Sequence, residues 1–231
     1  MSEKIFTIPI NEAFDSHDGC PMCRLRSALD ESTLSYTLGA AMMEPDVRIK
    51  MNGAGFCREH LSALRSMKNK LALALILESH LADVSALFDT PVSEKKGLFS
   101  SKQPRADAGD QLREISGSCF VCRRVRSTEL RYFSNVAWLW ESDEKFRDRL
   151  RAQPFICVTH AAGILEAGRR ELRAENYRSL YEAIAELDRA YLEKLRADIT
   201  EFTVSFDHRN AGTQLSDEAR SSIERAAEFL R

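Results

Sequence analysis

CPMCR at residues 20–24 and GFCREH at residues 55–60 are the stretches that decide how this chain folds. They form a CxxC pair followed about 34 residues later by a CxxH pair, and the same order returns as SCFVC at 118–122 and FICVTH at 155–160. The four motifs use all six cysteines and two of the five histidines. The residues are Cys20, Cys23, Cys57, His60, Cys119, Cys122, Cys157 and His160.

Pairs of this kind are typical of metal ligands. A structural zinc ion takes four tetrahedral ligands, and three thiolates with one histidine form a common closed set. Residues i and i+3 lie on one side of a helix, so both members of a pair can bind the same ion. A helix N-terminus also favours thiolate over thiol. We therefore predict two Cys₃His sites holding two zinc ions, with an iron–sulfur cluster or redox dithiols as alternatives.

Spacing alone leaves open which pairs combine. A CxxC pair can close a site with the CxxH pair that follows it or with the more distant one. Closure with the following pair needs only one helix out and a shorter segment back. We therefore assign Cys20, Cys23, Cys57 and His60 to one site and the other four residues to the second.

The offsets between the motifs predict an internal duplication. The second CxxC pair lies 99 residues after the first, and the second CxxH pair lies 100 residues after the first. We predict a helical repeat at 1–89, a flexible linker at 90–110, a second repeat at 111–200 and a tail at 201–231. The linker collects Pro, Gly, Ser and Lys without an apolar period.

The apolar pattern is helical almost throughout, which predicts an all-α protein. Each CxxC pair begins a helix of about 20 residues, and the stripe after the second pair has one polar break, at Glu129. The segment 71–77 is apolar nearly all round, which predicts a buried helix. Ser216 is a candidate cap for a last helix with the stripe Ala219, Ile223, Ala226, Ala227 and Leu230, docked on the body. Only 4–10 suggests an extended piece.

Composition is that of an ordinary globular protein, with 44% apolar and 29% charged residues. A net charge of −2 argues against nucleic-acid binding by bulk electrostatics. We find no secretory signal, and the stretch 71–77 is too short to span a bilayer. We therefore expect a cytoplasmic protein without a membrane segment, where cysteines serve as ligands rather than disulfides.

With CPMCR at 20–24 and GFCREH at 55–60, the chain resembles a prokaryotic family of uncharacterised helical proteins that carry CPxCR, then GFCxxH, then a second CxxC. The likeness covers about 20–199. The second half departs from it, since 118–122 lacks the proline and 155–157 lacks the Gly-Phe lead. The resemblance implies a fold and a metal class but no activity.

The roles of several other residues can be predicted only in general terms. His17, three residues before Cys20, suits a surface role, while His80 suits a packed or solvated position in a helix and His208 has no assigned role. Core packing accounts for the aromatic residues of the second half better than a ligand pocket. The arginines beside the ligands suit charge shielding and hydrogen bonds to the ligands. The aromatic residues are Tyr132, Phe133, Trp138 and Trp140, and the arginines are Arg24, Arg26, Arg58, Arg123, Arg124 and Arg126.

These patterns favour a non-enzymatic protein whose metal sites pin helix starts together and present a surface to an unknown protein partner. A closed four-ligand site has no open position for a substrate. A metal- or redox-responsive regulator is the rival function, and a homodimer is a further alternative.

Overall fold

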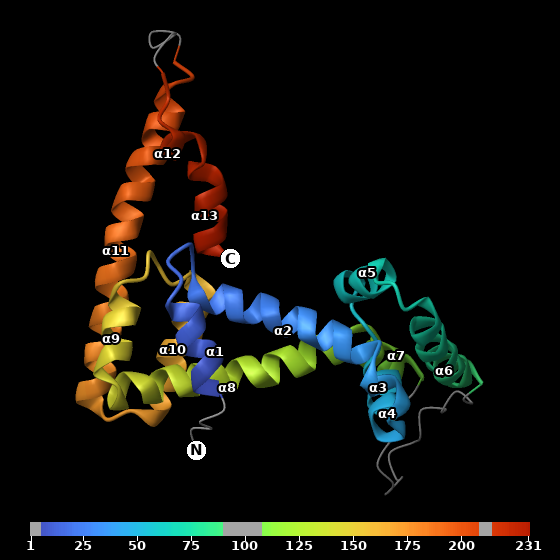
Figure 1. Ribbon diagram of the computed structural model, residues 1–231. Coiled ribbons are helices and arrows are strands. Elements are labelled where there is room, and N and C mark those ends of the chain that lie inside the picture. The colour runs from blue at the N-terminus through green and yellow to red at the C-terminus, as the bar shows by residue number, and fades with distance from the viewer. Residues whose placement is uncertain (1–5, 90–107, 208–213) are drawn as a thin grey trace, which may run out of the picture. The chain divides into compact units, whose positions relative to one another are not determined.

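The computed structural model describes residues 6–89, 108–207 and 214–231, and this part of the chain is helical, with no strand. It divides into two compact units, which we call unit 1 (Met1–Ser27 and Thr128–Arg231) and unit 2 (Ala28–Ser127). The all-α prediction is therefore confirmed. The boundaries of the units differ from those of the predicted repeats, because each unit combines segments from both halves of the sequence (Figure 1).

Unit 1 contains the first part of α2 (Pro21–Thr37) and most of α8 (Phe120–Ser142), which both continue into unit 2. Its other helices are α1 (Thr7–Phe14), α9 (Glu144–Arg151), α10 (Val158–Glu171), α11 (Ala174–Val204), α12 (Asp217–Arg220) and α13 (Ser222–Leu230). Figure 1 shows α12 and α13 folded back along α11, and α13 also contacts α10. The last helix therefore docks within the chain, as predicted.

Aromatic side chains hold this arrangement. Phe155, which precedes α10, stacks on Tyr191 of α11 at 4.4 Å between ring centroids and packs against Phe229 of α13 at 5.7 Å. Ser216 caps α12 by accepting a hydrogen bond from Ala219 N–H at 3.1 Å, as predicted. Arg225 adds an ion pair to Asp198 of α11 at 2.6 Å. These contacts fix α13 near the loop that leads into α10.

Unit 2 contains α3 (Ala40–Met43), α4 (Pro45–Ala54), α5 (Arg58–Ser66), α6 (Lys70–Phe88) and α7 (Ala108–Ser116), together with the second part of α2 and the start of α8. Its core includes Leu38, Met51, Leu64, Ile76 and Val121. Figure 1 shows α3 and α4 in light blue, α5 and α6 in blue-green to green, and α7 in green. The core is built mainly where α4 and α6 pack together.

Helix α6 corrects the prediction of a buried helix at 71–77. Only Ala72, Leu73 and Ile76 are buried, and Leu71 is 71% exposed. By length and composition, with a mean hydropathy of 1.6, α6 also meets the test for a membrane span that the shorter stretch failed. One such helix is weak evidence for a span, because helices of soluble proteins pass the same test.

Two further expectations about the ends need correction. Residues 7–10 belong to α1 rather than to an extended piece, and α11 continues to Val204, past the predicted start of the tail. In the last helices the buried side chains are Ala219, Ser222 and Phe229, whereas Ile223 and Leu230 of the predicted stripe are exposed. The buried residues are spaced three and seven positions apart, so the buried face passes through Ser222 and Phe229 rather than through Ile223 and Leu230. Most of the predicted linker (90–107) and His208 lie outside the described residues.

Candidate metal sites

Each of the four motifs is built in the same way at the start of a helix. Cys57 and Cys157 occupy the cap positions of α5 and α10, with extended backbones at φ/ψ −67°/164° and −61°/156°. The histidine of each pair follows in the first turn. Cys20 and Cys119 likewise precede α2 and α8, and their carbonyls accept from Cys23 and Arg123 N–H at 3.1 and 3.0 Å. A cap residue and a first-turn residue therefore direct two ligand atoms to the same point beyond the helix end.

The eight ligand candidates come together as two groups of four, and in each group the ligand atoms lie within 4.8 Å of one another. The unit-1 group is Cys20, Cys23, Cys157 and His160, and the unit-2 group is Cys57, His60, Cys119 and Cys122. The prediction of two Cys₃His sets is confirmed. The assignment of each CxxC pair to the CxxH pair that follows it is wrong, since the first CxxC pair meets the second CxxH pair and the reverse.

The local fold explains this exchange of partners. Gly55 ends α4 with φ +60°, a conformation suited to glycine, and its carbonyl accepts from Phe120 N–H at 2.9 Å. That hydrogen bond joins the loop before Cys57 to the start of α8, directly after Cys119. In unit 1, Asp188 of α11 accepts from Ile156 N–H at 2.8 Å and so fixes the loop before Cys157. A backbone hydrogen bond therefore holds each loop in place. It uses the Gly55 carbonyl before Cys57 and the Ile156 N–H before Cys157.

The distances within the groups are those of ligands that surround a single point. In the unit-1 group His160 Nδ1 lies 3.0, 3.3 and 3.6 Å from the sulfurs of Cys157, Cys23 and Cys20. In the unit-2 group His60 Nδ1 lies 3.1, 3.3 and 3.4 Å from the sulfurs of Cys57, Cys122 and Cys119. Both histidines thus use Nδ1 toward the thiols and leave Nε2 for another partner.

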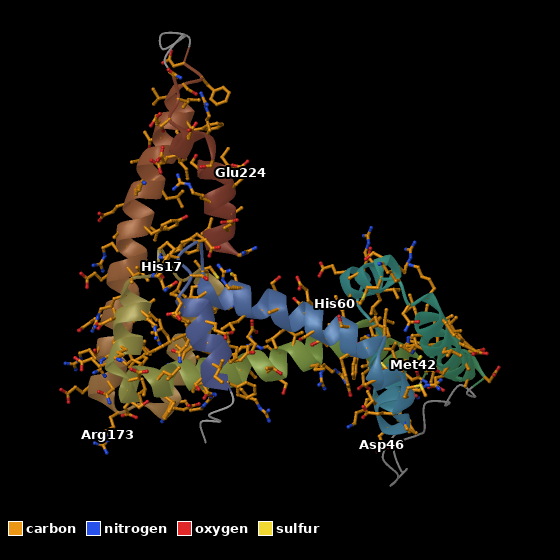
Figure 2. The ribbon with its side chains drawn as sticks, viewed as in Figure 1. His17, Met42, Asp46, His60, Arg173 and Glu224 are labelled. Atoms are coloured by element: carbon orange, nitrogen blue, oxygen red, sulfur yellow. The ribbon has the colours of Figure 1, made fainter. Side chains whose placement is uncertain are left out.

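That partner is a carboxylate in both groups. His160 Nε2 lies 3.3 Å from Glu129 Oε1, and His60 Nε2 lies 3.3 Å from Asp30 Oδ1 (Figure 2 labels His60). Each carboxylate stands seven residues after the second cysteine of a CxxC pair, on α8 or α2. Glu129 is 1% exposed and also accepts from Arg26 at 3.2 Å. A carboxylate on the outer nitrogen fixes the ring and raises its basicity as a metal ligand.

Neither carboxylate was predicted from the sequence, although one of them left a signal there. Glu129 was the polar break in the apolar stripe of α8, and a buried charge at such a place needs a partner. Asp30 lies beside the stripe of α2 and gave no comparable signal. Of the arginines, Arg26 pairs with Glu129 rather than with a ligand, while Arg24 pairs with Asp18 and Arg124 lies over the Tyr36 ring.

The thiols and the imidazole of the unit-1 group change one another's pKa values. Hydrogen bonds, first from Cys157, raise the pKa of Cys20 and lower that of Cys23. Burial lowers the pKa of His160, but hydrogen bonds with Cys157, Cys23 and Glu129 outweigh it and raise the pKa to about 11. In the unit-2 group, desolvation and then Cys119 raise the pKa of Cys122 to about 12. A bound cation would have to displace these protons, so binding must weaken in acid.

Residues outside the groups take structural places. His17 is exposed and belongs to neither group, while His80 bonds with the Asn52 carbonyl at 2.8 Å. Tyr132, Phe133 and Trp140 are buried in the core of unit 1, in agreement with the packing interpretation. The open cavity of about 520 Å³ in unit 1 lies elsewhere, between α10 and α11.

Among the comparisons with known proteins, only the one with family models gives a match. No curated protein and no solved structure matches it significantly. One family model matches residues 1–231, from end to end, and its description agrees with the resemblance carried by the CPMCR and GFCREH motifs. This chain therefore belongs to the family of unknown function DUF6062.

Proposed function

We propose that this chain binds two zinc ions, one in each Cys₃His group, and that the ions serve as structural clasps in a helical protein that acts through contact with a protein partner. The observation that carries the proposal is the meeting of two helix starts at each group, with three sulfurs and one imidazole nitrogen around a common point. Two such sets account for every cysteine of the chain.

The separations between ligand atoms support a single tetrahedral ion. With zinc–sulfur bonds of about 2.3 Å and zinc–nitrogen bonds of about 2.0 Å, a tetrahedron places sulfurs about 3.8 Å apart and sulfur about 3.5 Å from nitrogen. The sulfur pairs Cys23–Cys157 and Cys57–Cys122 lie 3.6 and 3.9 Å apart. The sulfur–nitrogen distances span 3.0 to 3.6 Å. An iron–sulfur cluster, which distributes its ligands over several irons, would need a wider set.

Charge and coordination number support a structural role. Three thiolates and a neutral imidazole around a divalent ion leave a net charge of about −1, which two helix N-termini stabilise. Four protein ligands fill a tetrahedral ion and leave no position for a substrate. A closed site of this kind favours a non-enzymatic protein.

Apolar side chains at the surface of unit 2 support the proposal of a protein partner. Met43, Ile49, Leu71, Leu81 and Phe88 are 64 to 75% exposed. Apolar side chains in this number suit a contact with another protein chain, a second copy of this chain included. A net charge of −2 does not suit nucleic acid, and six thiols suit a reducing compartment such as the cytoplasm.

Elemental analysis of protein purified anaerobically without added metal tests the zinc assignment. We expect two zinc ions per chain and a colourless solution. Cys157→Ser and Cys119→Ser, one substitution in each group, should each reduce the content to one. A brown sample with iron and sulfide would favour the cluster, and less than one metal ion per wild-type chain would refute metal binding.

A further inference from the structure

The two Cys₃His groups differ in their access to solvent. In the unit-1 group Cys20, Cys157 and His160 are buried, at 6, 0 and 3% exposure. In the unit-2 group only Cys119 is buried, and Cys122 is exposed. A ligand from solvent can therefore approach the centre of the unit-2 group past Cys122.

The carboxylates that contact the two histidines differ in solvent exposure in the same way. The side chain of Glu129, behind His160, is 2% exposed, whereas that of Asp30, behind His60, is 31% exposed. The Arg231 carbonyl accepts from Thr159 N–H at 3.3 Å, which fixes this residue at the start of α10. This hydrogen bond ties the residue after α13 to the start of the helix that carries His160.

The helices that carry the histidines also differ in how firmly they are packed. Helix α10 buries His160, Ile164, Ala167 and Gly168, and the residues that precede it, Phe155 and Ile156, are buried too. Helix α5 buries only Leu64, and Phe56 before it is partly exposed. Packing alone can hold α10 in place, whereas α5 has one buried apolar anchor besides the ligand group at its start.

We propose that the unit-2 group is a metal-exchange site and the unit-1 group a permanent structural site. Exchange begins when a competing thiolate or nitrogen ligand from solvent takes the place of Cys122 on the zinc ion. The Cys122 thiolate then takes up a proton from a buffer acid in solution, which is left as its conjugate base. Removal of the ion frees the start of α5, so metal loading controls the order of that helix. This inference rests on the proposed binding of zinc to both groups.

The test follows metal release and thiol accessibility together in the wild-type protein. Anaerobic two-zinc protein is mixed with excess 4-(2-pyridylazo)resorcinol, which colours on binding zinc, and N-ethylmaleimide pulses followed by peptide mass spectrometry report which cysteines have become free. We expect one zinc ion to leave at least tenfold faster than the other. In that fast phase Cys57, Cys119 and Cys122 should be labelled while Cys20, Cys23 and Cys157 remain protected.

Hydrogen exchange on the one-zinc species tests the effect on α5. Amides of Arg58–Ser66 should lose protection while those of Val158–Glu171 keep it. Release of both ions at one rate, or first labelling of the unit-1 cysteines, would overturn the exchange proposal while leaving zinc binding intact. Unchanged protection of α5 after loss of the first ion would overturn the control of that helix by metal. Protein that holds no zinc at the outset would instead refute the proposed function itself.

Discussion

Glu129 and Asp30 are matched residues that differ mainly in burial, which makes them a direct test of how a carboxylate supports a histidine ligand. Each lies 3.3 Å from the Nε2 of its histidine. We expect Glu129→Gln to lower the zinc affinity of the unit-1 group by about 10- to 100-fold, because an amide polarises the imidazole less than a carboxylate does. Competition with a chelator of known affinity measures this change.

Asp30→Asn provides the matched comparison for the unit-2 group. Its effect should be smaller, because a partly exposed carboxylate is screened and water can replace it. A larger loss of affinity in Asp30→Asn than in Glu129→Gln would contradict this account of the two histidines.

Gly163 of α10 lies directly against the ring of Phe133 on α8. A Cβ atom at this position would overlap the ring of Phe133 and lie 2.5 Å from its Cζ. Phe133 is 1% exposed and its ring centroid is 6.1 Å from that of His160. We expect Gly163→Ala to destabilise the protein by about 1 to 3 kcal/mol through overpacking. Denaturant unfolding of the zinc-loaded protein gives the free energy.

The control for Gly163 is Gly53, which lies in α4 with no atom within 4 Å of an added Cβ. Gly53→Ala should stabilise the protein by about 0.5 to 1 kcal/mol, because alanine loses less backbone entropy in a helix. Equal effects of the two substitutions would show that helix propensity, and not the contact with Phe133, decides the outcome.

At the scale of single elements, the sequence predicted the helices with the strongest periodic signal. The helices after the CxxC pairs, α2 and α8, have 17 and 23 residues against about 20 expected. The prediction for α6 was wrong, because an apolar sequence does not reveal whether another helix is present to cover it. The stripe of α12 and α13 was right for Ala219 but wrong for Ile223 and Leu230, because the packing of Phe229 against Phe155 and Tyr191 selects the neighbouring helical face.

Asp188 connects α11 to the loop before α10 and makes the stability of that connection dependent on pH. Burial raises its pKa from 3.8 to about 6, despite the hydrogen bond from Ile156 N–H. The folded state therefore favours the protonated acid. Protonated Asp188 therefore stabilises the folded state fully below about pH 4, and this stabilisation is lost as the pH rises toward about 6.

Asp188→Asn keeps an acceptor for Ile156 N–H and removes the charge. We expect the variant to be more stable than the wild type at pH 7 by about 1 kcal/mol, after allowance for the partial exposure of this group. At pH 4 the two proteins should have the same stability. Thermal unfolding across this range, with zinc in excess, measures the difference, and a gap of equal size at both pH values would exclude a titration of Asp188.

At the scale of the whole molecule, the sequence selected the eight residues that form the two groups but paired them wrongly. Spacing determines which two residues lie on one helix start, whereas the choice of partner depends on packing between distant segments. The free energy that favours pairing a motif with its nearest neighbour in the sequence is small. Lengthening a closed loop from about 34 to about 137 residues costs only about 1.2 kcal/mol, since each doubling adds about 0.6 kcal/mol. Contacts such as Gly55 with Phe120 outweigh a difference of that size.

The exchanged pairing means that both groups join residues before 90 to residues after 107, since Cys20 and Cys23 meet Cys157 while Cys57 meets Cys119 and Cys122. A protease site inserted within 90–107 therefore gives a strict test. We expect the cut chain to elute in size-exclusion chromatography as one 26.2 kDa particle with both zinc ions. Chelation should weaken the association of the two fragments, because the two ions that link them have been removed. The fragments should then separate at protein concentrations at which the zinc-loaded particle stays intact.

The control for the cut chain carries Cys20→Ser and Cys57→Ser, which remove one ligand from each group but leave the apolar packing in place. It should dissociate at the same concentrations with and without chelator. If the fragments of the unsubstituted chain instead separate while each retains one zinc ion, the ligands close within the halves of the sequence and the exchanged pairing is refuted. Because both pairings use the same eight residues, metal content alone cannot distinguish them, whereas the cut chain separates them by whether the metal holds two pieces together.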